Sequence, residues 1–265
     1  MLFPEEPFFI LRDLEDFAIL SVNGIFGKWR SEKNAMRHQS LIPNRFLFHI
    51  EMECGYREGL DELQELPECF TLPDFEVLED PQVSDGIFSR KARGGKEFYV
   101  RSAWNERGIA FQFFVSGKSK ELWCNPDRPD ESDRIELWLD TRNVHDVHRA
   151  TRYCHRFVCF PTGSGRDGDE AAVLFQPVSR TKQIPNEIPD GAMKIRSHVQ
   201  RNCYSVFLYL SASALTGFDT REFRHLGIAW ALIDRELPMK TLTAGAPFPF
   251  MEDPSLWYSL FLKED

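Results

Sequence analysis

The chain has 265 residues, a formal net charge of −9 at pH 7, and 23 phenylalanines beside 16 glycines and 16 prolines. This acidic balance argues against a nucleic-acid partner, because phosphate binding requires clustered Lys and Arg side chains. No apolar run approaches the ~18 residues of a membrane span, so no membrane partner is expected. The first 20 residues lack a basic start and are broken by charges, so no signal peptide is expected. The six cysteines include no Cys-x-x-Cys pair, which predicts reduced thiols and a cytoplasmic location.

Residues 1–62 differ in composition from the rest and are predicted to be an N-terminal extension of a β domain at 63–265. Within the extension, residues 8–19 suggest a short helix or a pair of strands. Residues 45–52 suggest a strand, because they include β-branched and aromatic side chains. The extension either packs on the β domain or binds a protein partner, and its composition does not separate the two.

From residue 66 onward, short apolar segments alternate with turn signals at regular intervals. Residues 97–104 and 109–115 predict a hairpin around Gly108, a glycine suited to a positive φ angle. No long amphipathic helix interrupts the pattern, so the expected fold is a mainly antiparallel β-sandwich. The strands are predicted at 75–78, 97–104, 109–115, 133–140, 153–160, 172–178, 193–199, 203–210, 225–233 and 257–262.

The clearest alternation lies at residues 133–140. Ile135, Leu137 and Leu139 share one face and predict core packing, while the opposite face is expected to meet water or a ligand. The simpler alternative is that Trp138 covers a neighbouring strand and that Arg134 and Glu136 form a solvated pair.

A sugar site needs an aromatic ring against the apolar face of a pyranose, and acids, amides or arginine for its hydroxyl groups. Residues of this kind gather on the 133–140 strand, on the next strand and on neighbouring elements. An internal partner such as Glu136 or Asp140 would instead give the residues of the second strand a structural role. The predicted ligand contacts are Arg134, Glu136, Trp138, His155 and Arg156, with Trp104 and Trp123 as stacking partners.

A metal-dependent enzyme is the alternative suggested by Asp140, His145, His148 and His155, because His145 and His148 are three residues apart and could meet on one helical turn. Glycoside hydrolysis by Glu136 and Asp140 is disfavoured, since four residues of strand separate them by roughly 13 Å. The chain is therefore expected to be non-catalytic and to carry no cofactor.

Four stretches together resemble a known kind of domain: GIAFQFFVSGK, DRIELWLDTR, HRFVCFPTG and CYSVFLYLSASALTGFDTREFRHLGIAWALID. Their order is similar to that in carbohydrate-binding modules of family 9, which are related to DOMON domains. In that family a hairpin precedes an acidic D-x-x-E-x-x-x-D strand, matched here by Asp133, Glu136 and Asp140. The resemblance spans residues 66–262. It departs from the family at Ser211, where a proline is usual, and in lacking an acid within 203–210.

This resemblance implies a β-sandwich whose relatives bind sugars, haem or other small ligands on one concave face, or have no known ligand. The fold does not choose among these ligands. The function expected is non-catalytic binding of a small ligand, with a carbohydrate as the leading candidate. The alternatives are a protein-interaction scaffold using residues 1–62 and the metal-dependent enzyme.

Overall fold

The computed structural model describes residues 50–60, 98–242 and 248–264. All of them belong to the second of two compact units, Met1–Leu47 and Phe48–Asp265. The predictions for residues 8–19, 45–49 and 75–78 lie outside the described residues. In the described parts of the chain, no helix has the length and hydropathy of a membrane span.

The described residues are mainly β-strands joined by loops and three short 3-10 turns, as the alternating pattern predicts. Most predicted strands are confirmed to within three residues at each end, because alternation and turn residues are local signals. The strands are β1 (Glu51–Tyr56), β2 (Phe98–Asn105), β3 (Gly108–Ser116), β4 (Arg134–Asp140), β5 (Cys154–Ser164), β6 (Glu170–Phe175), β7 (Met193–Val199), β8 (Cys203–Ser211), β9 (His225–Ile233), β10 (Lys240–Thr241) and β11 (Tyr258–Lys263).

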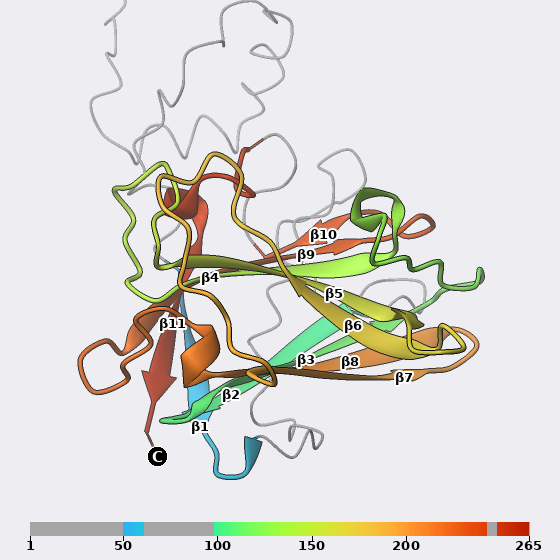
Figure 1. The fold of residues 1–265 in the computed structure, drawn as a ribbon, viewed down its shortest axis with the longest axis horizontal. Helices are drawn as coiled ribbons and strands as arrows, with labels where there is room; N and C mark the ends of the chain where they lie inside the picture. Colours follow the sequence, from blue (N-terminus) through green and yellow to red (C-terminus); the bar gives the residue numbers. More distant parts are fainter. Residues whose placement is uncertain (1–49, 61–97, 243–247, 265) are drawn as a thin grey trace, which may run out of the picture. The chain divides into compact units, whose positions relative to one another are not determined.

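The strands form one sheet in the order β6-β5-β4-β9-β11-β1-β2-β3-β8-β7, with β10 paired to β9. β6 and β7 end this order, yet they contact each other, so the sheet bends into a nearly closed barrel. Figure 1 shows β4, β5, β6 and β9 over β2, β3, β7 and β8, with β1 and β11 at one side. The mainly β class is confirmed, whereas one bent sheet replaces the predicted pair of stacked sheets.

Strand β1 corrects two predictions. It runs parallel to both β11 and β2, so the sheet is mixed rather than purely antiparallel. It also lies inside the sheet, with Met52 and Cys54 buried, although residues 51–56 were assigned to the N-terminal extension. Parallel pairing joins segments that are distant in sequence, so a local pattern does not reveal it. The predicted boundary at residue 62 therefore does not separate the extension from the β domain.

The hairpin of β2 and β3 is confirmed, with Asn105 opposite Gly108. Gly108 has the positive φ that was predicted, at 159°. A Cβ at this position would also lie 2.2 Å from the carbonyl oxygen of Leu210 in β8. Glycine therefore allows the backbones of β3 and β8 to approach closely.

The interior of the sheet receives one face of β4. Ile135, Leu137 and Leu139 are fully buried, which confirms the predicted core face. Leu137 pairs with Trp230 of β9, whose ring centroid lies 4.8 Å from that of Phe98 in β2. This contact joins strands on opposite sides of the barrel. The core therefore fills the space that the bent sheet encloses.

Candidate functional site

The second face of β4 is closed. Trp138 is fully buried, and its ring meets that of Phe250 edge to face with centroids 5.6 Å apart. Phe250 belongs to the segment between β10 and β11. The prediction that Trp138 lies open to water or to a ligand is therefore wrong. The alternation of side chains along a strand shows which residues share a face, but it does not show what covers that face.

Arg134, Glu136 and Arg156 form a buried ion-paired group on the same face. The Glu136 side chain is 1% exposed and accepts from Arg134 Nε at 2.7 Å and from Arg156 Nε at 2.8 Å. The two arginine side chains are 9% and 18% exposed. Glu136 therefore offsets part of the positive charge of two arginines. The structural role anticipated for the second strand holds for Arg156, whereas the pair of Arg134 and Glu136 is buried rather than solvated. The proposed ligand contacts of Arg134 and Glu136 are thereby corrected, whereas Arg156 keeps part of its guanidinium accessible.

The three acids of the D-x-x-E-x-x-x-D pattern each hold part of the fold. Asp133 accepts from the backbone N–H groups of Trp123 at 3.0 Å and Arg235 at 2.9 Å. Asp140 accepts from the backbone N–H groups of Arg142 and Val144 at 3.0 and 2.9 Å. With Glu136 held by the two arginines, all three carboxyl groups have partners within the chain. The acidic pattern is therefore explained by the fold: Asp133 and Asp140 hold backbone segments at the two ends of β4, and Glu136 holds the two arginines.

The two tryptophans that were predicted to stack on a ligand differ in their exposure to solvent. Trp104 is fully buried, donates from Nε1 to the carbonyl of Lys263 at 3.0 Å and meets Tyr56 edge to face. Trp123 is partly exposed, and Arg235 Cζ lies 5.3 Å from its ring centroid. The stacking role predicted for Trp104 is therefore wrong, whereas the role of Trp123 stays a prediction.

The residues suggested for a metal site do not converge. His145 Nε2 contacts the Ser259 hydroxyl at 3.0 Å, and His148 Nδ1 contacts Asp253 Oδ2 at 2.8 Å. His155 is fully buried, and its Nε2 accepts from the backbone N–H of Thr216 at 2.9 Å. Within residues 50–60, 98–242 and 248–264, no group of three or more His, Cys, Asp or Glu side chains is placed to hold a metal ion. The predicted ligand contact of His155 is also corrected, because its ring lies in the interior.

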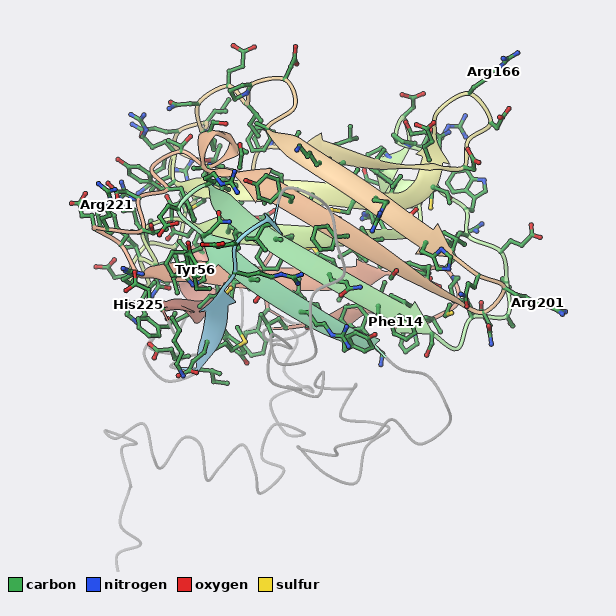
Figure 2. The ribbon with its side chains drawn as sticks, turned by 90° about the horizontal axis from the view of Figure 1, so that it is seen from below. Tyr56, Phe114, Arg166, Arg201, Arg221 and His225 are labelled. Carbon is green, nitrogen blue, oxygen red and sulfur yellow. The ribbon has the colours of Figure 1, made fainter. Side chains whose placement is uncertain are left out.

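A pocket at one end of the sheet is the strongest candidate site, and we call it the loop pocket. It has a volume of about 440 Å³ and lies where β4 ends, β5 begins and three further loops meet. Figure 2 shows Arg221, two residues before the pocket residue Phe223, at the opposite end of the molecule from Arg166 and Arg201. The lining residues are Asp140, Arg142, Val144, Val147, Thr151, Tyr153, Cys154, Gln183, Phe223 and Pro254.

Arg142 is held between two aromatic rings in the wall of the loop pocket. Its Cζ lies 3.8 Å from the ring centroid of Phe223 and 4.3 Å from that of Tyr153. Its Nη1 donates to the carbonyls of Thr141 at 3.1 Å and Gly217 at 2.6 Å. Gly217 has a φ of +79°, and a Cβ there would lie 2.8 Å from Arg142 Nη2 and from the Tyr153 ring. Only glycine therefore fits beside the guanidinium without displacing it.

The segment that carries Gly217 is fixed from the interior. Thr216 donates its N–H to His155 Nε2, its carbonyl accepts from Thr141 Oγ1 at 2.7 Å, and its hydroxyl accepts from the Asn186 N–H at 2.8 Å. Burial lowers the pKa of His155 to about 4, so the imidazole is neutral at pH 7 and its Nε2 remains an acceptor. Hydrogen bonds of Thr216 to buried groups therefore hold this part of the pocket wall in place.

The two groups at the floor of the loop pocket are poorly suited to covalent chemistry. Burial raises the pKa of the Cys154 thiol to about 12, so the thiolate is scarce at neutral pH. Burial also raises the pKa of Asp140, although hydrogen bonds from two backbone N–H groups and the positive charge of Arg142 oppose this effect. Asp140 is the one carboxyl group among the described lining residues, and glycoside hydrolysis ordinarily uses two. The pocket is better suited to binding than to catalysis.

Among the residues that line the pocket, the sequence pointed to Asp140, as a metal ligand, an internal partner and part of the acidic pattern, but not as part of a sugar pocket. Arg142 lies two residues after the predicted strand at 133–140, and Gly217 lies in the stretch that carries the family resemblance. These positions are the signals in the sequence that could have indicated the pocket. Tyr153 and Phe223 come from loops far apart in the chain, so only the folded sheet shows that they enclose the same guanidinium.

No protein-family model and no curated protein sequence matches the chain. Solved structures do match. A carbohydrate-binding module of family 9 from Caldicellulosiruptor kristjanssonii in complex with cellotriose is 12% identical, with a TM-score of 0.50, and the match covers 82% of this chain and 95% of that chain. The same kind of module from that organism in complex with glucose is 11% identical, with a TM-score of 0.51 and coverages of 82% and 97%. The chain therefore has a fold like that of carbohydrate-binding modules of family 9.

Proposed function

We propose that the chain is a non-catalytic carbohydrate-binding domain and that the loop pocket holds the sugar. The observation that carries this proposal is the composition of the pocket. Two aromatic side chains, Tyr153 and Phe223, stand beside the hydrogen-bonding groups of Arg142, Thr151 and Gln183 in a volume of about 440 Å³. Pockets for small ligands are of this size and combine apolar walls with a few polar groups that orient the ligand.

The fold supports the proposal without deciding it. The two similar structures contain cellotriose and glucose, but their sequences are only 12% and 11% identical to this chain. The choice of the loop pocket rests on its own geometry. The β4 face predicted from the sequence offers less, because Trp138 and Glu136 are fully buried.

Calorimetric titration with cellotriose and glucose tests the proposal. Phe223→Ala removes an aromatic wall and is expected to weaken binding about 10-fold. Phe114→Ala is the matched control. Like Phe223, Phe114 is a partly exposed phenylalanine, and its ring centroid lies 4.7 Å from that of Tyr99. Figure 2 shows Phe114 well away from Arg221, which is two residues from Phe223.

Arg156→Ala separates the loop pocket from the β4–β5 face. Arg156 is the member of the buried ion-paired group with the most exposed side chain, at 18%. If Arg156→Ala abolishes sugar binding while Phe223→Ala leaves it unchanged, the site lies on the β4–β5 face and the proposal for the loop pocket fails. If no sugar binds the unaltered chain, the proposed function fails.

A cytoplasmic location stays a prediction. The described cysteines are all free thiols, and Cys54, Cys154 and Cys159 are buried. Docking of a protein through residues 1–62 also stays a prediction, since residues 1–49 lie outside the described part of the chain.

A further inference from the structure

The guanidinium of Arg142 is held by groups that carry no formal charge. Its hydrogen bonds go to two backbone carbonyls, and its other contacts are the faces of Tyr153 and Phe223. Among the described residues, Arg142 has no carboxylate within ion-pair distance. Carbonyl dipoles and aromatic rings favour a cation, but they leave its net charge in place.

Three arginines on or beside β4 differ in this respect. Arg134 and Arg156 share the carboxylate of Glu136, and Arg235 contacts Asp133 at 3.2 Å. Asp140, the acid in the pocket lining, accepts from the backbone N–H groups of Arg142 and Val144 and not from the guanidinium. Burial raises the pKa of Asp140, and the two backbone N–H groups and the charge of Arg142 oppose this effect. The lining of the loop pocket therefore presents a guanidinium that no carboxylate holds in an ion pair.

The charge is also held in one position before any ligand arrives. Two rings confine the guanidinium plane, Gly217 accepts from Nη1, and Thr216 fixes Gly217 through its bond to His155. A guanidinium that is already oriented loses little conformational entropy when a ligand binds. Nη2 and Nε make no hydrogen bond within the described residues. Neither group is therefore committed to an acceptor in the described part of the protein.

We propose that the loop pocket selects an acidic sugar, a hexuronic acid residue whose carboxylate accepts hydrogen bonds from Arg142. The inference rests on the proposed function, because it names the class of sugar that the same pocket takes. The aromatic rings and the polar groups Thr151 and Gln183 meet the sugar ring, and Arg142 meets the carboxylate. A neutral hexose fills the same space but offers the guanidinium no ion-pair partner.

The matched pair methyl β-glucoside and methyl β-glucuronide tests this, since they differ only in the group at C6. Titration of the full chain by calorimetry is expected to show the glucuronide binding about 10-fold or more tightly at low salt. In about 0.5 M NaCl, where the Debye length falls to roughly 4 Å, this preference is expected to shrink. Equal affinity for the two sugars overturns the inference while leaving the proposed function standing, and binding of neither overturns both.

Arg142→Gln is expected to remove the preference, and Arg142→Lys to keep part of it, because Lys retains the charge without the planar fork. Arg152→Gln is the matched control. Arg152 is an exposed arginine whose Cζ lies 5.7 Å from the same Tyr153 ring and which donates to Asn186 at 3.1 Å. The control is expected to keep the preference for the glucuronide. A preference unchanged in Arg142→Gln, or lost equally in Arg152→Gln, contradicts the assignment, and thermal melting of each variant establishes that it is folded.

Discussion

Glu136→Gln removes the one negative charge from a group in which two arginines are mostly buried. The Glu136 side chain is 1% exposed and bridges Arg134 and Arg156 at 2.7 and 2.8 Å. A glutamine keeps the shape and one acceptor oxygen, but it leaves Arg156 without its carboxylate and Arg134 with only the exposed Asp130 at 3.9 Å. Breaking a buried ion pair by removing one partner costs about 3–5 kcal/mol of unfolding free energy. For a domain of this size that corresponds to a fall in Tm of roughly 6–20 °C.

Urea denaturation followed by tryptophan fluorescence measures this loss, since Trp138 lies on the same buried face. Glu53→Gln is the matched control. Glu53 pairs with Lys263 at 2.7 Å, but the two side chains are 62% and 51% exposed. An exposed pair of this kind contributes about 0–1 kcal/mol. If Glu136→Gln costs no more than Glu53→Gln, the β4 face is hydrated, and the description of Trp138 and Glu136 as sealed is wrong.

Two further predictions concern the support beneath the loop pocket. The pKa of His155 is lowered to about 4 by burial, from an ordinary value of 6.5. Between pH 6.5 and pH 4, this histidine binds a proton in the unfolded chain but not in the folded chain. The unfolding free energy therefore keeps its full value above pH 6.5 and falls by about 3 kcal/mol as the pH drops to 4. Urea unfolding across this range measures the loss, and His155→Gln, which does not titrate, should flatten it; an unchanged slope in that variant contradicts the assignment. Gly217→Ala is expected to weaken sugar binding as well as stability, because its Cβ would meet Arg142 Nη2 at 2.8 Å. Gly168→Ala is the control, having a similar φ of +73° and no atom within 4 Å of its Cβ, and should cost stability alone.

The strands were predictable because their signals are local. Alternation at residues 133–140 and the hairpin around Gly108 depend on neighbouring residues, and the structure confirms both as β4 and the β2–β3 hairpin. The parallel placement of β1 was not predictable in this way. Its partners, β11 and β2, are chosen by long-range packing of Met52 and Cys54 into the core.

The candidate site was less predictable than the fold, for two physical reasons. The alternation of β4 placed Trp138 and Glu136 correctly on one face, but the burial of that face depends on Phe250 and Arg156 from other parts of the chain. The loop pocket depends on side chains from several loops, of which the sequence pattern identified only Asp140. Residue spacing carries no information about which loops meet at one end of a bent sheet.

Two-dimensional amide NMR of the isotopically labelled chain, titrated with cellotriose, locates the bound sugar residue by residue. We expect the largest shifts at Tyr153, Phe223 and the backbone and guanidinium of Arg142. Shifts concentrated around Arg156 and β5, with the loop pocket unaffected, would place the sugar elsewhere and contradict the account.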